Sequence, residues 1–331
     1  MNLEGKIAEA RARIAPYVRR TSLVRLRTGD VPAGVPDVAR GVREAPVADL
    51  RLGRDVWLKL ECEQLSGSFK ARGALNRVLS LPPEVAKRGI VTASGGNHGL
   101  AVAYAGRVVD VEATVFLPRL TPASKAARIE RWGARVVRAG DVWDDAHAAA
   151  TELARKEGKT YVHPFADEDV IAGQGTIVLE LFEQEIEPID LLVVAIGGGG
   201  LIAGVASAAK KLRPSIRVIG VEPEGAPTLK ESLRANAVIE LPEIRTAAGT
   251  LAPRRSHETN LAIIRETVDD IVLVTDDEMR DAARFLLVEL GVGAELSGAA
   301  ALAAILAGRI RLGNSKSPCA LVCGAGDGAL L

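Results

Sequence analysis

The sequence has no excess of charge of either sign and few cysteines, and each shortage excludes a class of protein. Lysine and arginine together number 42, as do aspartate and glutamate, so no overall field recruits nucleic acid or an anionic membrane. The three cysteines, Cys62, Cys319 and Cys323, have no metal-binding spacing and form no even disulfide framework. We therefore expect a cytoplasmic protein that acts on a small molecule, without nucleic-acid or membrane partners.

Long apolar runs are also missing, although apolar residues make up 48% of the 331 positions. No run reaches the roughly 18 residues that a membrane span needs. The N-terminal stretch is charged and helical in period, without the apolar centre of a signal peptide. The chain is long enough for one large domain or two modest ones with an ample core.

From Val56 onward, short apolar runs alternate with longer segments of helical period, which predicts an α/β fold with a parallel sheet covered by helices on both faces. The predicted strands are 56–60, 90–93, 113–117, 135–139, 191–196, 218–221, 271–274 and 320–323. Residues 28–50 mix glycine, proline and charge without periodicity, which predicts a surface loop or strand-poor insertion. No long linker separates two halves, so two domains would have to be interleaved.

Residues 65–74 place a lysine, Lys70, directly behind a Ser/Gly turn and at the start of a predicted helix. The positive end of a helix disfavours an ammonium group, so Lys70 is biased toward the neutral amine. A neutral amine is a nucleophile that can hold an aldehyde cofactor as a Schiff base. Taken alone, the segment is better explained by an ordinary solvated lysine, so the assignment depends on the rest of the chain.

A glycine-rich turn joins a predicted buried strand to a predicted helix. Its residues are Gly197, Gly198, Gly199, Gly200 and Leu201. Backbone N–H groups converge in such a turn and the helix start adds positive potential, so the turn suits a phosphate. A tight turn without a ligand stays open. The spacing meets the dinucleotide fingerprint loosely, with Glu222 near the place of its acidic residue, so a nucleotide site is an alternative.

Another turn follows a predicted strand at the sheet edge where ligands bind in parallel sheets. Its residues are Ser94, Gly95, Gly96, Asn97 and His98. Helix N–H groups, a serine hydroxyl and an asparagine amide together predict a site for an anion of the size of a carboxylate. Cys323 ends the last predicted strand, where it is either an inert core cysteine or a contact to the cofactor from the far side.

Taken in chain order, these four segments resemble the fold-type II pyridoxal-phosphate enzymes, and most closely the serine/threonine dehydratase branch. The match runs from about Val56 to the C-terminus, and residues 161–165 and 173–176 resemble the segment that joins the family's two domains. The resemblance implies two open, twisted, mostly parallel sheets flanked by helices, as in tryptophan synthase β. It also implies pyridoxal 5'-phosphate as cofactor, an amino acid as substrate and a homodimer.

The family motifs assign roles to the matching residues of this sequence. Lys70 is implied to be the Schiff-base lysine, with Phe69 beside it in the cofactor site. Asn97 is implied to bond the phenolic oxygen of the cofactor, and residues 94–98 to hold the substrate carboxylate. The glycine turn 197–201 corresponds to the phosphate loop of the family.

Cys323 falls where the family has a serine or cysteine beside the pyridine nitrogen. A neutral thiol does not stabilise a protonated ring, so the ring is a weaker electron sink and β-elimination is favoured over transamination. We expect Lys70 to remove the α-proton as general base while the β-hydroxyl leaves, with the cofactor phosphate protonating it as the resemblance implies. A 3-hydroxy amino acid such as serine or threonine would then give a 2-oxo acid and ammonia.

Several positions depart from the family pattern. The second serine of the serine racemases is Gly95 here, which makes racemisation the less favoured alternative. The cation site of the family keeps Glu222 but has Thr228 at its second position, so a divalent or monovalent cation is left open. Residues 248–250 read Ala-Gly-Thr in place of Ala-Asp-Gly, which reshapes the substrate side. The run 254–260 is either a solvated loop or a contact for a polar substrate side chain.

We expect residues 1–84 and 161–331 to form a large cofactor domain and residues 85–160 a small inserted domain, with the site in the cleft between them. The chain ends eight residues after Cys323, so we expect no appended regulatory domain and a degradative role. β-Replacement is an alternative, although cysteine and threonine synthases carry threonine where this chain has His98. A non-catalytic nucleotide or phosphate binder is a further alternative, but it would not need Lys70, Asn97 and Cys323 together.

Overall fold

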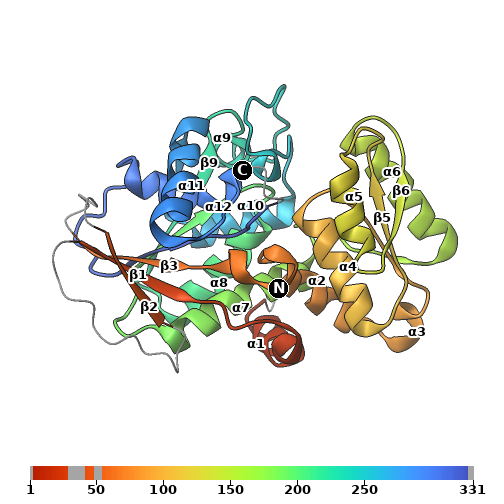
Figure 1. The fold of residues 1–331 in the computed structure, drawn as a ribbon, viewed down its shortest axis with the longest axis horizontal. Coiled ribbons are helices and arrows are strands. Elements are labelled where there is room, and N and C mark those ends of the chain that lie inside the picture. Colours follow the sequence, from red (N-terminus) through yellow and green to blue (C-terminus); the bar gives the residue numbers. More distant parts are fainter. Residues whose placement is uncertain (1–2, 29–41, 48–53, 327–331) are drawn as a thin grey trace.

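Two β-sheets flanked by helices make up the protein in a computed structural model that describes residues 3–28, 42–47 and 54–326 (Figure 1). The larger sheet has seven strands in the order β10-β9-β8-β11-β3-β1-β2, and the smaller has four in the order β6-β5-β4-β7. The large-sheet strands are β1 (Leu23–Thr28), β2 (Val42–Val47), β3 (Val56–Lys59), β8 (Leu191–Ala195), β9 (Arg217–Pro223), β10 (Asp270–Val274) and β11 (Pro318–Leu321). The small-sheet strands are β4 (Ile90–Ala93), β5 (Ala113–Leu117), β6 (Arg135–Arg138) and β7 (Thr160–Tyr161).

Neighbouring strands run parallel in both sheets except where β1 meets β3. A parallel sheet is covered on both faces, which explains why its central strands read as continuous apolar runs. All five residues of β8 are buried, as are all four of β4. The predicted fold class, two mostly parallel sheets flanked by helices, is confirmed.

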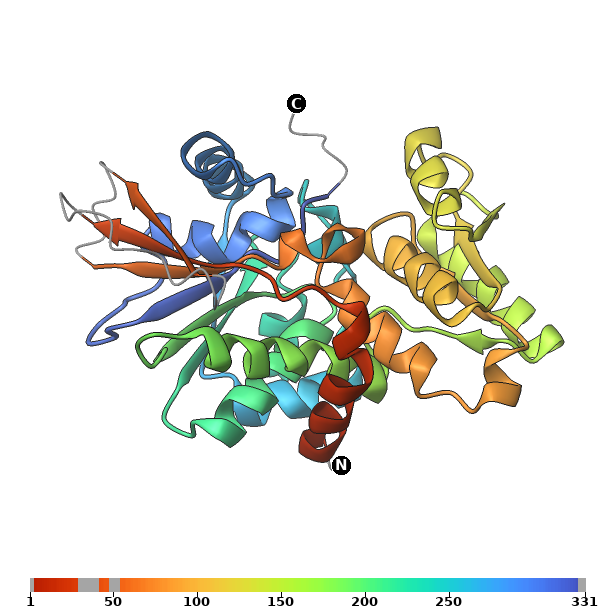
Figure 2. The same ribbon diagram turned by 60° about the horizontal axis from the view of Figure 1, so that its bottom comes forward.

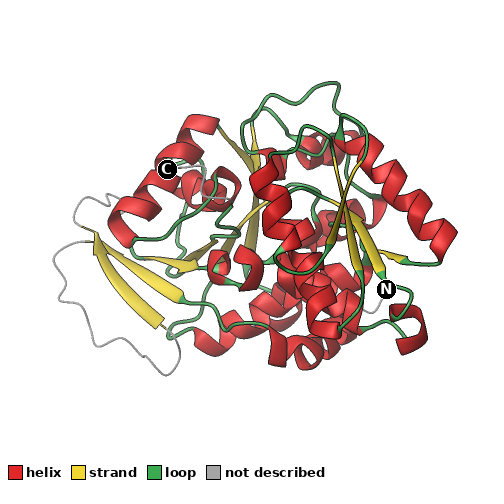
Figure 3. Ribbon diagram, turned by 45° about the vertical axis from the view of Figure 1, so that its right-hand side comes forward, coloured by secondary structure: helices red, strands yellow, loops and turns green. Residues whose placement is uncertain are grey.

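Helices cover both sheets and connect their strands (Figures 2 and 3). The helices are α1 (Leu3–Ile14), α2 (Lys70–Leu79), α3 (Pro83–Ala86), α4 (Asn97–Val109), α5 (Ala123–Glu130), α6 (Trp143–Glu157), α7 (Glu168–Gln184), α8 (Gly200–Leu212), α9 (Thr228–Ala235), α10 (Glu258–Thr267), α11 (Asp276–Leu290) and α12 (Leu296–Leu306). Short 3-10 turns are η1 (Ala15–Tyr17), η3 (Glu61–Glu63), η4 (Leu65–Gly67) and η5 (Gly249–Leu251). Among these described helices, none combines the length and the apolar composition of a membrane span.

Local sequence signals set several helix ends. The Asp167 carboxylate accepts the N–H groups of Asp169 and Val170 at 2.8 and 3.1 Å and so caps α7. Thr275 and Glu278 form a capping box at the start of α11, and Gly291 ends that helix with φ +64°. These caps satisfy backbone groups that would otherwise lack partners at the helix ends.

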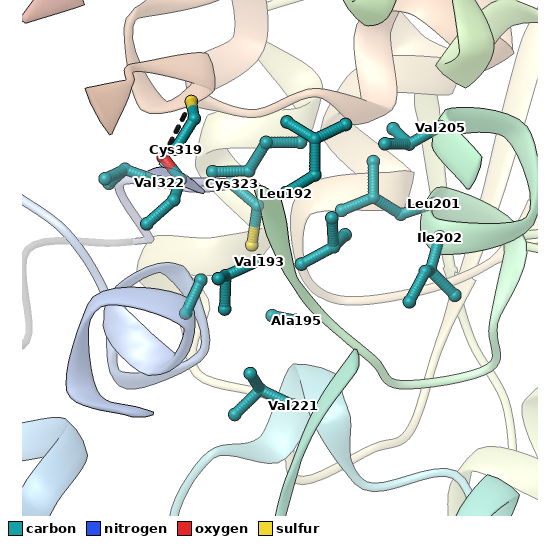
Figure 4. Packing of buried hydrophobic residues seen from close by; sticks show 14 of the residues in the cluster. Leu192, Val193, Ala195, Leu201, Ile202, Val205, Val221, Cys319, Val322 and Cys323 are labelled. Carbon is teal, nitrogen blue, oxygen red and sulfur yellow. Dashed lines mark hydrogen bonds between the residues drawn. The ribbon is translucent and has the colours of Figure 1, made fainter. Parts of the chain in front are cut away.

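The core of the large sheet packs aliphatic side chains of β8, β9 and β11 against α8 and α12 (Figure 4). Leu201 and Ile202 of α8 belong to this core, with exposed fractions of 7% and 0%. Cys319 and Cys323 also lie in it. The glycine turn that precedes α8 is therefore fixed to the sheet by the apolar residues that follow it.

A buried network of charged side chains joins β3, η3, α2 and α7. Arg72 donates from Nε and Nη2 to the two Glu61 carboxylate oxygens, each at 2.8 Å, and from Nη2 to Glu180 at 2.9 Å. Lys59 Nζ donates to the other Glu180 oxygen at 2.6 Å. All four side chains are fully buried. Because Arg72 lies in the first turn of α2, the network fixes the helix that begins at Lys70.

Strands β1, β2 and β7 were not predicted. The strand β2 lies inside residues 28–50, so the prediction of a strand-poor loop is wrong there, while 29–41 and 48–53 lie outside the described residues. Strand β2 lies at the edge of the sheet, contains Pro46 and is held by backbone pairing to β1. Its sequence lacks the apolar run that identified the other strands. The last strand ends at Leu321, so Cys323 lies just beyond it.

Candidate active site

The lysine segment and the C-terminal segment run side by side. The N–H of Phe69 donates to the Cys323 carbonyl at 3.1 Å, and the N–H of Ala325 donates to the Gly67 carbonyl at 2.9 Å. An isolated β-bridge also pairs Ser68 with Gly324. Residues more than 250 positions apart are thus brought together, as expected if both contact one ligand.

Lys70 begins α2 and is partly buried. Its Nζ donates to the Pro164 carbonyl at 2.6 Å, and the same atom lies 5.1 Å from the centre of the Phe69 ring. Burial lowers the pKa of Lys70 to about 8, although the Glu295 carboxylate favours its charged form. The amine is therefore easily deprotonated, as the sequence argument expected, but burial is the largest cause and not the helix start.

The neighbour of Pro164, Phe165, connects Lys70 to the glycine turn. A Cβ atom built on Gly198 would lie 2.3 Å from the Phe165 ring, so only glycine fits there. Asn260 Nδ2 donates to the carbonyls of both Gly198 and Phe165, at 2.7 and 3.1 Å. Gly199 has φ +91°, a left-handed conformation that favours glycine, and α8 begins at the next residue.

The run 254–260 supports this turn from behind. Ser256 Oγ donates to the Gly198 carbonyl at 2.9 Å, alongside the bond from Asn260. Arg254 Nε donates instead to the Leu241 carbonyl at 2.9 Å. The run 254–260 therefore stabilises the glycine turn by binding the Gly198 carbonyl. This structural role differs from both predictions for the run, a solvated loop and a contact to the substrate.

The second turn places its polar groups at the start of α4. Ser94 Oγ accepts the N–H of Gly96 at 3.3 Å, and Asn97 Nδ2 donates to Glu295 Oε1 at 2.6 Å. The N–H of Glu295 in turn donates to the Gly324 carbonyl at 3.1 Å. The substrate turn is thus tied to the segment that carries Cys323.

His98 makes its side-chain hydrogen bond outside the second turn. It is 4% exposed, and its Nε2 donates to the Val162 carbonyl at 2.9 Å. Burial, together with the charge of Lys70, lowers its pKa to about 3, so the ring is neutral. The His98 side chain links α4 to Val162, the residue after β7. The His98 backbone lies in the first turn of α4.

Cys323 is buried and keeps its proton. Its Sγ lies 3.4 Å from the Ser297 carbonyl, to which the thiol donates. Burial raises the pKa of this thiol, and the nearby Glu295 carboxylate raises it further. The side chain therefore presents a neutral group to its surroundings.

A cavity of about 50 Å³ opens beside the second turn. It is lined by Gly95, Gly96, Asn97, Leu100, Lys125, Arg128, Thr250, Glu295 and Gly326. Lys125, Arg128 and Glu295 belong to none of the motifs found in the sequence. A weak signal existed for Glu295, an acidic residue directly before the apolar helix α12, but the two cations of α5 carry no motif.

Two serine hydroxyls near Lys70 are buried, and neither has a hydrogen-bond partner in the described part of the chain. They belong to Ser66 and Ser68. Buried hydroxyls are rarely left without a partner, so this arrangement indicates groups reserved for a ligand. Ser68 Cβ lies 3.5 Å from the position a Cβ on Gly324 would take, between the lysine and C-terminal segments.

Glu222 lies apart from the site. Its carboxylate accepts the N–H groups of Leu229 and Lys230 at 2.7 and 2.9 Å, so it caps α9. Burial raises its pKa to about 7, against these two bonds. Thr228 Oγ1 donates to the Pro253 carbonyl at 2.7 Å. Within the described ranges, no group of three or more His, Cys, Asp or Glu side chains is placed to hold a metal ion.

Comparison with known proteins identifies this constellation. Residues 39–324 match the family described as "Pyridoxal-phosphate dependent enzyme". L-threonine ammonia-lyase of Thermotoga maritima is 41% identical over 254 residues, which are 77% of this chain and 63% of that protein. Serine racemase of Oryza sativa subsp. indica is 37% identical over 300 residues, 91% of this chain and 82% of that one. The structure of maize serine racemase has a TM-score of 0.86 at 34% identity, covering 97% of this chain and 92% of that one.

The chain therefore belongs to the family of pyridoxal-phosphate dependent enzymes, and its cofactor is pyridoxal 5'-phosphate. Within that family it lies in the serine/threonine dehydratase branch, to which its relatives named threonine ammonia-lyase belong. The predicted family, branch and cofactor are confirmed. The chain spans about 63% of the length of the Thermotoga relative.

Proposed function

We propose that the chain is an ammonia-lyase that converts serine, threonine or a related 3-hydroxy amino acid into a 2-oxo acid and ammonia by β-elimination. One observation carries the proposal. The easily deprotonated amine of Lys70 lies near a thiol, Cys323, that burial keeps neutral. The names of several relatives, threonine ammonia-lyase and catabolic threonine dehydratase, support the same reaction.

The residues present fit the cofactor. Lys70 offers a nucleophilic amine to its aldehyde, beside Phe69 and the unpartnered hydroxyls of residues 66 and 68. The turn 197–201 offers N–H groups at the start of α8 to its phosphate. Asn97 would bond the phenolic oxygen and Cys323 would contact the ring nitrogen. When bound, the cofactor supplies an electron sink that acidifies the α-proton of the amino acid.

The protein groups then have distinct tasks. Lys70 Nζ takes the α-proton, a task that suits an amine whose pKa of about 8 lies near neutrality. The N–H groups and hydroxyl of residues 94–98 bind the substrate carboxylate at the start of α4. Cys323 contributes no negative charge, which disfavours transamination relative to loss of the β-hydroxyl.

Serine racemisation is the second candidate, because relatives with that name align over most of the chain. Racemisation needs an acid/base group on the face of the substrate opposite Lys70, and Gly95 supplies no side chain there. A Cβ at position 95 would lie 3.1 Å from Thr121 Cγ2, so a serine would be crowded. The lack of a side chain at Gly95 supports the lyase over the racemase.

We also retain the expectations of domain organisation, assembly and location. The small-sheet strands come from residues 90–161, which supports an inserted small domain at 85–160 between 1–84 and 161–331. Figure 1 supports it too, since α4, α5 and α6 are set apart with this sheet. A cytoplasmic homodimer is proposed from the family resemblance and from the composition.

A panel of amino acids tests the proposed function. Purified holoenzyme incubated with serine, threonine and other 3-hydroxy amino acids should release 2-oxo acid and ammonia in equal amounts. The same incubations with sulfide should give no thioether or thiol product, which separates the lyase from β-replacement enzymes. Formation of the D-enantiomer faster than 2-oxo acid would assign the racemase instead.

A further inference from the structure

Two cationic side chains that the proposed reaction does not use line the cavity beside the substrate turn. Lys125 and Arg128 lie three residues apart on α5, so they share one helix face. Both are partly buried. They face the cavity together with Gly95, Gly96 and Asn97, the residues proposed to hold the substrate α-carboxylate. The cations therefore lie within reach of whatever extends from the bound substrate.

Arg128 carries a charge that its own contact does not neutralise. Its Nη1 donates to the Gly326 carbonyl at 3.1 Å, and that carbonyl is a neutral group. A guanidinium has several further N–H donors in a fixed plane, a geometry that matches a carboxylate with two parallel bonds. An anionic ligand group in the cavity would thus meet a suitable partner.

The charged residues that are described around the cavity favour an anion. They are two cations, Lys125 and Arg128, and one carboxylate, Glu295. Glu295 Oε1 already accepts bonds from Asn97 Nδ2 at 2.6 Å and from Thr250 Oγ1 at 3.3 Å. These bonds hold that carboxylate oxygen at the substrate turn.

The cavity has room for the three heavy atoms of a carboxylate, because its volume is about 50 Å³.

We propose that the cavity holds the side-chain carboxylate of an acidic 3-hydroxy amino acid, and that Arg128 is the specificity-determining residue for it. The inference rests on the proposed function, because the α-carboxylate is taken to lie on residues 94–98. Elimination removes the Cα proton and breaks the Cβ–O bond, so that water leaves. Hydrolysis then consumes one water and releases ammonia, which makes the product a 2-oxo dicarboxylic acid.

The first test compares substrates. With the holoenzyme, kcat/KM for 3-hydroxyaspartate should exceed that for serine and threonine by tenfold or more. Arg128→Gln should lower the ratio of acidic to neutral kcat/KM by 10- to 100-fold, mainly through KM for the acid. Arg131→Gln removes the same charge from the exposed end of the same helix, and it should leave the ratio within twofold.

A second readout does not depend on turnover. Aspartate and 2-aminobutyrate lack the leaving hydroxyl, and their binding to the holoenzyme can be measured by calorimetry. Aspartate should bind at least tenfold more tightly than 2-aminobutyrate, with the preference lost in Arg128→Gln and partly restored in Arg128→Lys.

The outcomes separate the two proposals. If serine and threonine release 2-oxo acid but neither the kinetic nor the binding preference depends on Arg128, the acidic subsite is overturned and the lyase stands. If no amino acid of the panel releases 2-oxo acid, the proposed function fails, and the aspartate titration still decides whether Arg128 selects a second carboxylate.

Discussion

Two lysines of this protein, Lys59 and Lys70, are both removed from solvent but have opposite surroundings. Lys59 is fully buried and donates to the Glu180 carboxylate at 2.6 Å within a network that also contains Arg72 and Glu61. Lys70 donates to a neutral carbonyl at 2.6 Å. A buried lysine beside a carboxylate is structural, whereas one beside neutral groups becomes a nucleophile.

Burial lowers the pKa of Lys59 as well, but the charges of Glu180 and Glu61 oppose it, so the difference lies in the acidic partners. Burial alone would raise the pKa of the Glu180 carboxyl, but the charges of Arg72 and Lys59 outweigh it and bring that pKa to about 2. Glu180 is therefore ionised and needs its cations. The pKa of Lys70 falls to about 8 because burial outweighs the opposing charge of Glu295. The charged network and the site thus use the same residue type for different purposes.

Replacing Lys70 should have the largest effect, and only on function. We expect Lys70→Ala to lower turnover by about 10⁴-fold or more, because one group both holds the cofactor and moves the proton. The visible absorbance of the bound cofactor should disappear. The free energy of unfolding of the apoenzyme should change by less than about 1 kcal/mol, since no ion pair is lost. A variant that kept both colour and turnover would refute the assignment of Lys70.

Replacing Lys59 should do the reverse. Lys59→Met removes the cation at Glu180 Oε1 and leaves Arg72 and the partly exposed Arg11 at Oε2, so it should lower the free energy of unfolding by about 3–5 kcal/mol. Urea denaturation of the apoenzyme measures this change. The folded fraction should still take up cofactor with its visible absorbance. The matched variant Lys59→Met/Glu180→Gln should recover part of the loss, and an unchanged midpoint in the single variant would show that the network is not a stabilising element.

Replacing Cys323 tests the neutrality of the site. Cys323→Asp introduces a carboxylate and should increase abortive transamination relative to elimination by about tenfold, because a charged partner strengthens the electron sink. The amount of cofactor converted to its amine form per turnover measures the partition. Cys323→Ser keeps a neutral group and serves as the control. Equal partition in the Asp variant and the wild type would contradict the role of the thiol.

The smallest effect is a shift in pH dependence. The unprotonated amine is the reactive form, so the labelling of Lys70 in the apoenzyme should rise with pH and level off above about 8. The labelling of an ordinary exposed lysine would level off only above about pH 10.4. Competitive acetylation followed by mass spectrometry measures Lys70 and the exposed lysines in one sample. If the labelling of Lys70 and of the exposed lysines had the same pH midpoint, the lowered pKa of Lys70 would be contradicted.

The sequence predicted those parts of the site that lie in continuous motifs. Lys70, Asn97, the turn 197–201 and Cys323 each follow or begin a regular element. Backbone hydrogen bonds join the Lys70 and Cys323 segments, Pro164 and Phe165 connect Lys70 to the glycine turn, and Glu295 connects Asn97 to the Cys323 segment. The family and cofactor implied by these motifs are confirmed.

Features that depend on tertiary packing were not predictable in this way. Lys125 and Arg128 lie on a surface-like amphipathic helix, and only packing of α5 across the cavity makes them part of the site. The cause of the low pKa of Lys70 was likewise assigned to the helix start, because burial cannot be read from a Ser/Gly turn. The strand β2 was missed because pairing with β1, and not an apolar pattern, defines it.

The most direct test of the account is to find which lysine carries the cofactor. The holoenzyme would be reduced with borohydride, digested and analysed by mass spectrometry for the phosphopyridoxyl group. The account predicts the modification on Lys70 in near-stoichiometric amount and none on Lys59. Modification of another lysine, or a protein that binds the cofactor without any reducible link, would contradict it.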